Sequence, residues 1–263
     1  MIPARPSPVM MRFFDRYVAR SLRRRFHRVL VWGWPPAAAP RSGAPVVFAM
    51  SHASWWDVLV GYHLARSLVG RPAWAPMDEL QLRRYRILAR LGLYSVDRTT
   101  LGGLREFLRY TQARLAAGDA VWMTPQGELV SPRRRPVRFQ AGLGHLARRV
   151  PGLAVVPVAV AYEFLDEPRP DVLVKFGASR TLPPGVRPGE ATRLLETDLE
   201  QALDALERAV VTRDLAPFTT VLEGATSTSL VYDCVWALRR MFTGVVDPAR
   251  HGDVVSDPRR RRA

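Results

Sequence analysis

A histidine and an aspartate that together suit proton transfer follow one apolar run of the sequence. His52 and Asp57 lie five positions apart in the stretch VFAMSHASWWDVLV at 47–60. Histidine is the side chain whose ordinary pKa suits proton removal near neutrality, and a neighbouring carboxylate fixes its tautomer and stabilises the imidazolium. A carboxylate with apolar neighbours is costly to bury unless something pairs with it. One interpretation of the spacing is therefore a histidine that takes up a proton, His52, with Asp57 as its partner.

The same stretch also fits the start of a helix. Ser51 or Ser54 would then act as the N-terminal cap, and the helix dipole would favour Asp57 in the first turn. The sequence leaves both interpretations open. No Gly-x-Ser-x-Gly sequence accompanies the pair, and the single cysteine, Cys234, lies in a separate C-terminal segment. A catalytic His52 would therefore act on a hydroxyl group that the substrate brings.

Two further blocks carry groups suited to a polar substrate. In LGLYSVDR, Gly92 and Arg98 bracket a short apolar run, and an arginine just past a strand end offers two parallel donors to a phosphate or carboxylate. A salt bridge to Asp97 is the alternative. In WMTPQGELV, the residues TPQG predict a turn in which Gly127 allows a ligand to approach the backbone closely.

An arginine-rich loop follows this turn, and a proline interrupts a later apolar run. The loop supplies positive charge to a site, or it is a solvated basic loop. Its arginines are Arg133, Arg134, Arg135 and Arg138. Pro157 stands inside VVPVAV, and because proline is disfavoured in central strands, it predicts a sheet edge, a bulge or the wall of a ligand site.

Strand-like and helix-like segments alternate along the chain. The expected strands are 45–50, 72–76, 93–96, 120–124, 154–162 and 172–176. The expected helices are 55–68, 80–91, 101–117, 140–150 and 191–211, with a last one near 230–242. This alternation predicts an α/β layered fold with a mixed, mainly parallel central sheet flanked by helices.

The N-terminal part reads as a basic amphipathic helix. Apolar residues recur at helical spacing over 10–32, and arginines lie largely on the other side. Such a helix suits a membrane interface, and packing on its own domain is the alternative. We expect a disordered lead, this helix and a linker over 1–44, the α/β domain over 45–215, and a helix with a basic disordered tail over 216–263.

The composition excludes some classes of protein. A hydrophobic content of 48% indicates a folded chain, and one cysteine excludes an intrachain disulfide. The net charge of +15 attracts polyanions, meaning nucleic acid or an anionic membrane. The arginines are spread over a helix, a loop and a tail, and no nucleic-acid-binding module is visible, so we expect no nucleic-acid partner. No apolar run is long enough to span a bilayer, and the N-terminus lacks an apolar signal sequence.

Taken in order, these blocks resemble the glycerolipid (lysophosphatidate-type) acyltransferase family. The resemblance covers about 45–165 and rests on several blocks in order. They are His52-x4-Asp57, APMDEL at 75–80, Gly92 with Arg98, Pro125-x-Gly127 with Phe139-x-x-Gly142, and Val156-Pro157. The family uses its His–Asp pair to deprotonate an acceptor hydroxyl, which attacks the thioester of acyl-CoA or acyl carrier protein.

The resemblance implies roles for residues of this chain. His52 would be the general base and Asp57 its orienting partner, while Arg98 would contact the polar head of a substrate. The turn Pro125, Gln126 and Gly127 would line the acceptor site together with Glu128, Arg133 and Arg138, and Pro157 would lie near the acyl channel. The chemistry would need no metal or resident cofactor, because a thioester is already activated.

The third block departs from the family pattern, Phe-Pro-Glu-Gly-Thr-Arg. Gln126 replaces the glutamate, and Leu129 replaces an arginine that the family associates with the acceptor's phosphate. Either Arg133–Arg135 or Arg138 replaces that contact, or the acceptor lacks a phosphate, as in a glycolipid or a glycosylated carotenoid.

The expected function is an O-acyltransferase that works on membrane lipids. Its expected location is the cytoplasmic face of the cell membrane, where it would bind peripherally, without a signal peptide or a transmembrane helix. A non-catalytic lipid- or polyanion-binding protein with the same fold is the alternative.

Overall fold

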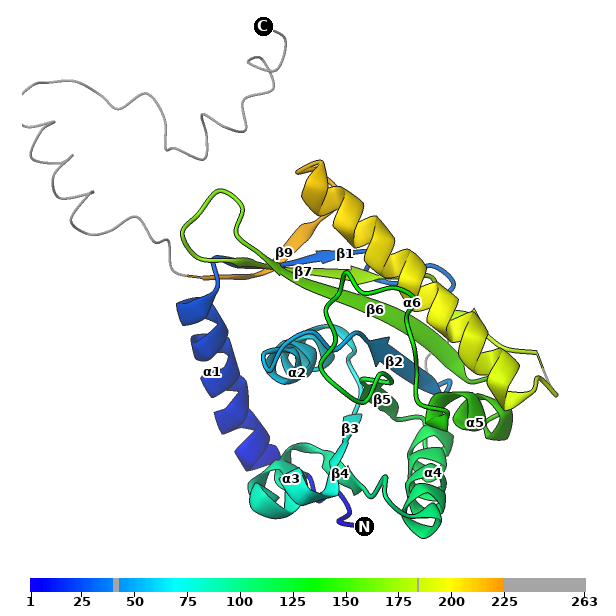
Figure 1. The fold of residues 1–263 in the computed structure, drawn as a ribbon. Helices are drawn as coiled ribbons and strands as arrows, with labels where there is room; N and C mark the ends of the chain where they lie inside the picture. Colours follow the sequence, from blue (N-terminus) through cyan, green and yellow to red (C-terminus); the bar gives the residue numbers. More distant parts are fainter. Residues whose placement is uncertain (40–42, 184, 225–263) are drawn as a thin grey trace, which may run out of the picture.

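A mixed β-sheet forms the centre of the molecule (Figure 1). The computed structural model describes residues 1–39, 43–183 and 185–224, and within these residues nine strands join in the order β4-β3-β5-β2-β6-β7-β1-β9, with β8 pairing β6. The strands are β1 (Arg28–Trp32), β2 (Val46–Met50), β3 (Ala73–Asp78), β4 (Leu93–Val96), β5 (Ala120–Met123), β6 (Ala154–Glu163), β7 (Asp171–Phe176), β8 (Arg180–Thr181) and β9 (Thr219–Glu223).

The strands from β4 to β6 run parallel to one another, whereas β7 runs antiparallel to β6. All five residues of β2 are buried, as expected for a strand covered on both faces. Because the carboxyl ends of parallel strands meet at one edge, the segments that follow β2, β3, β4, β5 and β6 lie close together. Each of the predicted site blocks before Pro157 follows one of these strand ends.

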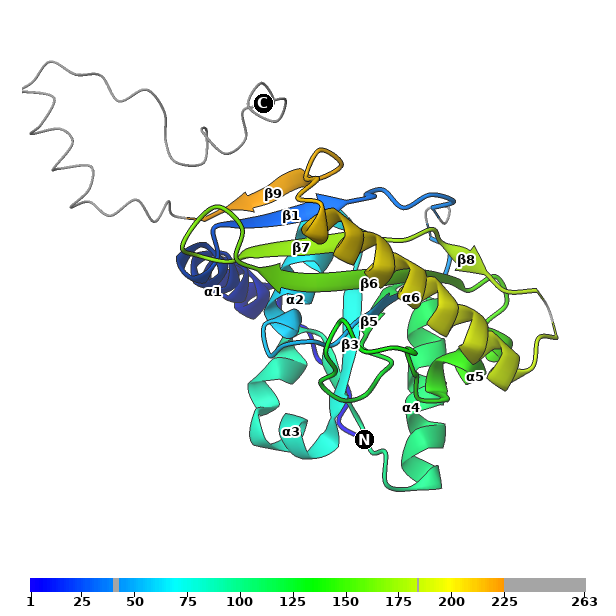
Figure 2. The ribbon, with the colours of Figure 1, turned by 45° about the horizontal axis from the view of Figure 1, so that its top comes forward.

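Helices cover both faces of the sheet (Figures 1 and 2). They are α1 (Pro8–Arg25), α2 (Asp57–Leu68), α3 (Glu79–Arg84), the 3₁₀ helix η1 (Arg86–Leu91), α4 (Leu101–Ala116), α5 (Gly142–Arg149) and α6 (Pro188–Val211). Helices α1 and α2 pack on one face through Val18, Leu22 and Leu64. Helices α4, α5 and α6 cover the other face. The predicted α/β layered fold, with its mixed and mainly parallel sheet, is confirmed.

The N-terminal segment differs from its prediction. The helix expected to reach residue 32 ends at Arg25, and Arg28–Trp32 instead pairs in parallel with β7 as strand β1. Three consecutive apolar residues of β1 are buried, because Val29 and Val31 pack in the cluster under α1 and Leu30 packs in the cluster under α6. The sheet therefore extends beyond the expected domain limits of 45 and 215 at both ends.

The first residues are bonded to the domain instead of forming a disordered lead. The N–H of Ile2 donates to Ser95 Oγ over 2.6 Å, and Ser7 caps α1. Of the two partners considered for the apolar face of α1, a membrane interface and its own domain, the structure shows the second for Phe14, Val18 and Leu22, which pack against the core. The expected C-terminal helix and tail, with Cys234, lie outside the described residues.

The expected helix over 80–91 is divided at Tyr85, where the backbone leaves the helical conformation between α3 and η1. Within the described part of the chain, no helix is long and apolar enough to cross a membrane.

Candidate active site

The loop after β2 places His52 at the edge of the sheet. Ser51, the residue before it, is buried and anchored to β6 by two hydrogen bonds. Its N–H donates to the carbonyl of Val158 over 2.9 Å, and its Oγ accepts from the N–H of Val160 over 3.0 Å. Ser51 is therefore a link between neighbouring strands and not a helix cap. His52 begins the first unpaired segment beyond β2.

His52 and Asp57 form the predicted pair. Nδ1 of His52 lies 2.9 Å from Oδ2 of Asp57. The carboxylate can only accept, so Nδ1 carries the proton and Nε2 keeps the lone pair that a general base needs. The Asp57 side chain is 1% exposed and the imidazole is 21% exposed. The carboxylate is thus sealed from water, while a substrate hydroxyl can reach the ring.

Three more donors hold the Asp57 carboxylate. The backbone N–H groups of Ala53 and Ser54 donate to Oδ2 over 2.6 and 2.8 Å. On the other side, the hydroxyl of Tyr162 donates to Oδ1 over 2.6 Å. The residues from His52 to the first turn of α2 therefore surround the Asp57 carboxylate with hydrogen-bond donors. These donors explain how a charged group is accommodated next to Trp55 and Trp56.

Gln126 holds the backbone of His52. Its Oε1 accepts the N–H of His52 over 2.9 Å, and the N–H of Val130 donates to the His52 carbonyl over 2.7 Å. The Gln126 side chain is buried, at 7% exposed. The segment after β5 therefore binds both the N–H and the carbonyl of His52. The structure thus places Gln126 behind the general base, where it orients His52. Pro125 is also buried, and its carbonyl accepts the N–H of Gln140.

Arg98, which follows β4, contacts residues at the ends of β3 and β5. Its Nη1 donates to the carbonyl of Gly127 over 2.6 Å, and its Nη2 lies 3.7 Å from Oδ2 of Asp78 at the end of β3. Gly127 has φ +74°, and a Cβ atom there would lie 3.0 Å from Arg98 Nη1. The arginine therefore braces the turn that carries Gln126. The alternative salt bridge to Asp97 does not form. Hydrogen bonds from the Thr100 and Thr99 side chains lower the pKa of Asp97 to about 2.

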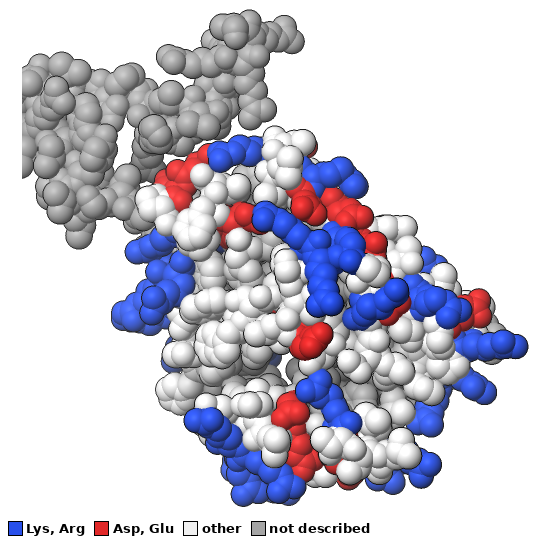
Figure 3. Space-filling view, in the orientation of Figure 1, with Lys and Arg blue, Asp and Glu red and all other residues white. Residues whose placement is uncertain are grey.

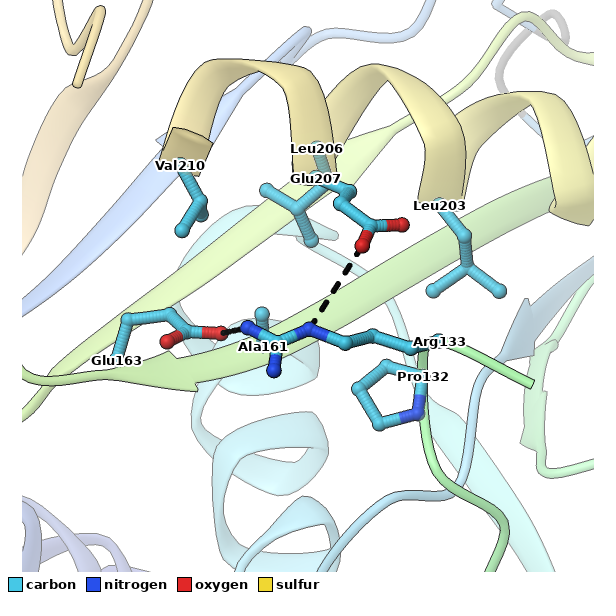
Figure 4. A pocket seen from close by; sticks show the side chains of 8 residues that line it. All are labelled: Pro132, Arg133, Ala161, Glu163, Leu203, Leu206, Glu207 and Val210. Carbon is cyan, nitrogen blue, oxygen red and sulfur yellow. Dashed lines mark hydrogen bonds and ion pairs between the residues drawn. The ribbon is translucent and has the colours of Figure 1, made fainter. Parts of the chain in front are cut away.

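The arginine loop lies along α6. Arg133 lies 3.2 Å from Glu163 and 3.7 Å from Glu207. Dashed lines mark both ion pairs in Figure 4. The remaining ion pairs join Arg135 to Asp204 and Glu207, and Arg138 to Glu196. Carboxylates of α6 and the end of β6 thus neutralise three of the four arginines. Glu128 and Leu129, by contrast, are exposed.

A shallow pocket lies under Arg133. Its apolar walls come from Leu203, Leu206 and Val210 of α6 and from Ala161 of β6 (Figure 4). Ala161 precedes Tyr162, and successive strand residues point to opposite faces of a sheet. The pocket therefore lies on the α6 face of β6, whereas Tyr162 and Asp57 lie on the α2 face.

Pro157 lies away from the His–Asp pair. It is in register with Ala49 inside β6, which is a central strand and not an edge. On the edge of β6 that faces away from β2, β8 pairs with residues up to Val155 and β7 pairs with residues from Val158 onward. Pro157, which has no N–H to donate, lies between these two paired stretches. A Cβ atom on Gly177 would lie 2.7 Å from Pro157 and 3.6 Å from Ala202, which places the proline under α6.

Tyr162 is the site residue that sequence reasoning missed. It stands 105 positions after Asp57, and only the pairing of β2 with β6 brings the two together. Burial and the nearby Asp57 carboxylate raise the pKa of the Tyr162 hydroxyl, so it stays a donor. The available signal was a tyrosine on the same strand face as Val158 and Val160 at the end of a buried strand.

We expect Tyr162→Phe to lower kcat about tenfold with KM nearly unchanged, because Oδ1 of Asp57 would lose its donor. Steady-state kinetics on the purified protein measure this. Tyr94→Phe is the matched control, since the Tyr94 hydroxyl is buried under α4 and bonded to Thr111 over 2.8 Å. Both variants should lose stability, but only Tyr162→Phe should lose activity. Equal kcat values for the two variants would contradict a role for Tyr162 in the site.

Among the described residues, no group of three or more His, Cys, Asp or Glu side chains is arranged to hold a metal ion. The groups that the site presents are an imidazole with a free Nε2 and a buried carboxylate that orients it.

Comparisons with known proteins concern the family and the fold of the chain. The family model described as Acyltransferase matches residues 36–161. No curated protein matches the chain in sequence. Among solved structures, the fold is similar to the crystal structure of the 1-acyl-sn-glycerophosphate (LPA) acyltransferase PlsC from Thermotoga maritima. The TM-score is 0.53 at 17% identity, over 75% of this chain and 80% of that chain. At this identity the likeness concerns the fold.

Proposed function

Since residues 36–161 make this chain a member of the acyltransferase family, we propose that it moves a fatty acyl group from acyl-CoA or acyl carrier protein to a lipid hydroxyl. The chain is an acyltransferase; the donor and the acceptor are the proposed parts. The observation that carries the proposal is the His52–Asp57 pair, with Nδ1 and Oδ2 2.9 Å apart and Nε2 free.

The mechanism follows from the free ring nitrogen. His52 Nε2 removes the proton from the acceptor hydroxyl as its oxygen attacks the thioester carbonyl carbon, and Asp57 stabilises the imidazolium. The tetrahedral intermediate then collapses, the C–S bond breaks, and the imidazolium returns its proton to the leaving thiolate. One ester forms, one thioester is lost, and His52 is neutral again. Because the thioester is already activated, the transfer needs no resident cofactor.

The charges near the turn favour an acceptor without a phosphate. Arg133, Arg135 and Arg138 already contact carboxylates, and Arg98 is bonded to the carbonyl of Gly127. Leu129, which follows the turn, is 61% exposed and apolar. A phosphate bound by Arg133, Arg135 or Arg138 would have to displace an existing ion pair, and Arg134 is the one exposed arginine of this described loop without such a pair. We therefore propose an uncharged lipid alcohol, such as the sugar hydroxyl of a glycolipid, as the acceptor.

A matched pair of acceptors tests this proposal. Lysophosphatidate and the monoacylglycerol with the same chain differ only in the phosphate. We expect kcat/KM to be at least about tenfold higher for the neutral acceptor, since one charge-assisted contact is worth about that much. Leu129→Arg should raise activity on lysophosphatidate selectively. Leu101→Arg, at another exposed leucine, is the control. A preference for lysophosphatidate that Leu129→Arg leaves unchanged would contradict the proposal.

A lipid acceptor implies work at a bilayer surface. We propose that the protein binds peripherally to the cytoplasmic face of the membrane. Exposed apolar side chains beside unpaired arginines support this location.

A further inference from the structure

We propose that α1, α3 and η1 together form one docking surface for an anionic phospholipid bilayer, an inference that rests on the proposed lipid substrate. The surface is defined by six exposed apolar or aromatic side chains, and each is between 47% and 76% exposed. They are Val9, Phe13, Tyr17, Leu80, Tyr85 and Ile87. Three come from α1 and three from the segment 80–87. The sequence alone pointed only to the first helix.

The membrane-facing stripe of α1 differs from the apolar stripe that packs on the core. Phe14, Val18 and Leu22 are taken up by the core. Val9, Phe13 and Tyr17 recur every four residues on the outer side, with arginines between them. Mixed aromatic and arginine side chains are typical of surfaces that lie at the level of lipid headgroups.

The two parts of the surface are fixed to each other. The N–H groups of Arg5 and Ser7, which lead into α1, donate to the carbonyls of Ala89 and Arg90 over 2.8 and 2.9 Å. Below them, an apolar cluster joins both parts through Met10, Phe14, Leu82 and Leu91. Figures 1 and 2 both show α1 and α3 along the same side of the molecule. They therefore present one surface to a bilayer.

The charge of this surface is not neutralised from within. Ion pairs within the described part of the chain leave six of its arginines free. They are Arg12, Arg16, Arg20, Arg84, Arg86 and Arg90. Figure 3 shows basic side chains over α1 and at the corner near α3. The arginines of the 133–138 loop differ, because carboxylates of α6 bind three of them. A free positive surface with apolar tips is complementary to anionic lipid headgroups.

The surface borders the active site. Helix α3 begins directly after Asp78, which lies 3.7 Å from Arg98. Arg98 donates to the carbonyl of Gly127, and the neighbouring Gln126 accepts the N–H of His52. The side chains of Arg98 and Gln126 thus connect Asp78, at the start of α3, to His52.

Vesicle flotation tests the apolar part of the surface. The full chain is mixed with vesicles of equal parts phosphatidylglycerol and phosphatidylcholine. We expect Leu80→Ser to weaken binding about tenfold, since a leucine side chain would no longer enter the interface. Val211→Ser is the matched control, because Leu80 and Val211 are 76% and 75% exposed and Val211 ends α6. Equal binding by the two variants would overturn the proposal.

Charge reversal tests the contribution of the arginines of this surface. Arg84→Glu with Arg86→Glu should weaken binding to the same vesicles about tenfold and flatten its salt dependence. The control is Arg148→Glu with Arg149→Glu at the exposed end of α5. Equally tight binding of the unaltered chain to pure phosphatidylcholine vesicles, or a preference for duplex DNA over vesicles, would contradict an anionic bilayer as the occupant.

Activity in detergent micelles separates this inference from the proposed function. Leu80→Ser should transfer acyl groups to a micellar acceptor as fast as the unaltered chain, because Leu80 is outside the catalytic residues. If no acceptor is acylated while Leu80→Ser still loses vesicle binding, the proposed function fails and the docking surface stands. If transfer is normal and Leu80→Ser binds vesicles like Val211→Ser, the docking surface fails alone.

Discussion

Substituting His52 by alanine is expected to lower kcat for acyl transfer by about 10³-fold, within the range that a positioned general base contributes. The alanine leaves Asp57 bonded to Ala53, Ser54 and Tyr162, so the loop keeps its shape. The thioester remains reactive, but nothing removes the proton of the attacking hydroxyl. KM for the donor should change little, because His52 acts on the acceptor.

Release of free thiol in the presence of a lipid acceptor measures this loss. His145→Ala is the control, since His145 is an exposed histidine on α5 with no role in the pair. The melting temperature of both variants should stay close to that of the unaltered chain. Full activity of His52→Ala would refute the general-base mechanism, and an equal loss in His145→Ala would point to an effect on folding.

Asp57→Asn is expected to lower kcat by about 10²–10³-fold while retaining the fold. The amide oxygen can still accept from the N–H groups of Ala53 and Ser54, and the amide nitrogen can face Tyr162 by turning the hydroxyl round. What is lost is the negative charge beside the imidazole. The imidazolium that forms on proton removal is then less stable.

A second buried aspartate that contacts a histidine separates this effect from misfolding. Asp171→Asn is a matched control: Asp171 is 1% exposed and contacts His27 over 3.1 Å, as well as Arg28. It should lower the melting temperature and leave kcat unchanged, whereas Asp57→Asn should lose kcat. Equal kcat values for the two variants would contradict the assigned partner.

The local parts of the site were predictable from the sequence. His52 and Asp57 are five residues apart, so one loop and one helix start decide their contact. The strand ends at 50, 96 and 123 follow from apolar runs that stop at polar residues. Parallel pairing then gathers the blocks at one edge, which explains why the fold class and the meeting of the blocks were both predictable.

The roles of individual residues were less predictable, because they depend on contacts between distant segments. Arg98 was expected to bind substrate, yet it is bonded to Gly127, and Gln126 holds His52. The arginine loop looked free in sequence, but α6 supplies its carboxylates from about 60 residues later. A second His–Asp contact, His27 with Asp171, is separated by 144 positions and has no local pattern.

The N-terminal strand shows how burial overrides local periodicity. Over 10–32 the apolar spacing is compatible with one helix. The sheet nevertheless takes Arg28–Trp32 because its edge strand β7 needs a partner for its backbone groups. No local signal reveals that need.

The position of β1 between β7 and β9 sets an order for folding on the ribosome. Val29 pairs with Val172 and with Leu222, so both of its partners are synthesised long after it. The nascent chain must carry an unsatisfied apolar strand until almost all of the described residues have emerged, which slows folding and exposes it to aggregation. A truncation before Glu223, or a deletion of residues 10–32, should therefore yield insoluble protein instead of a smaller working enzyme.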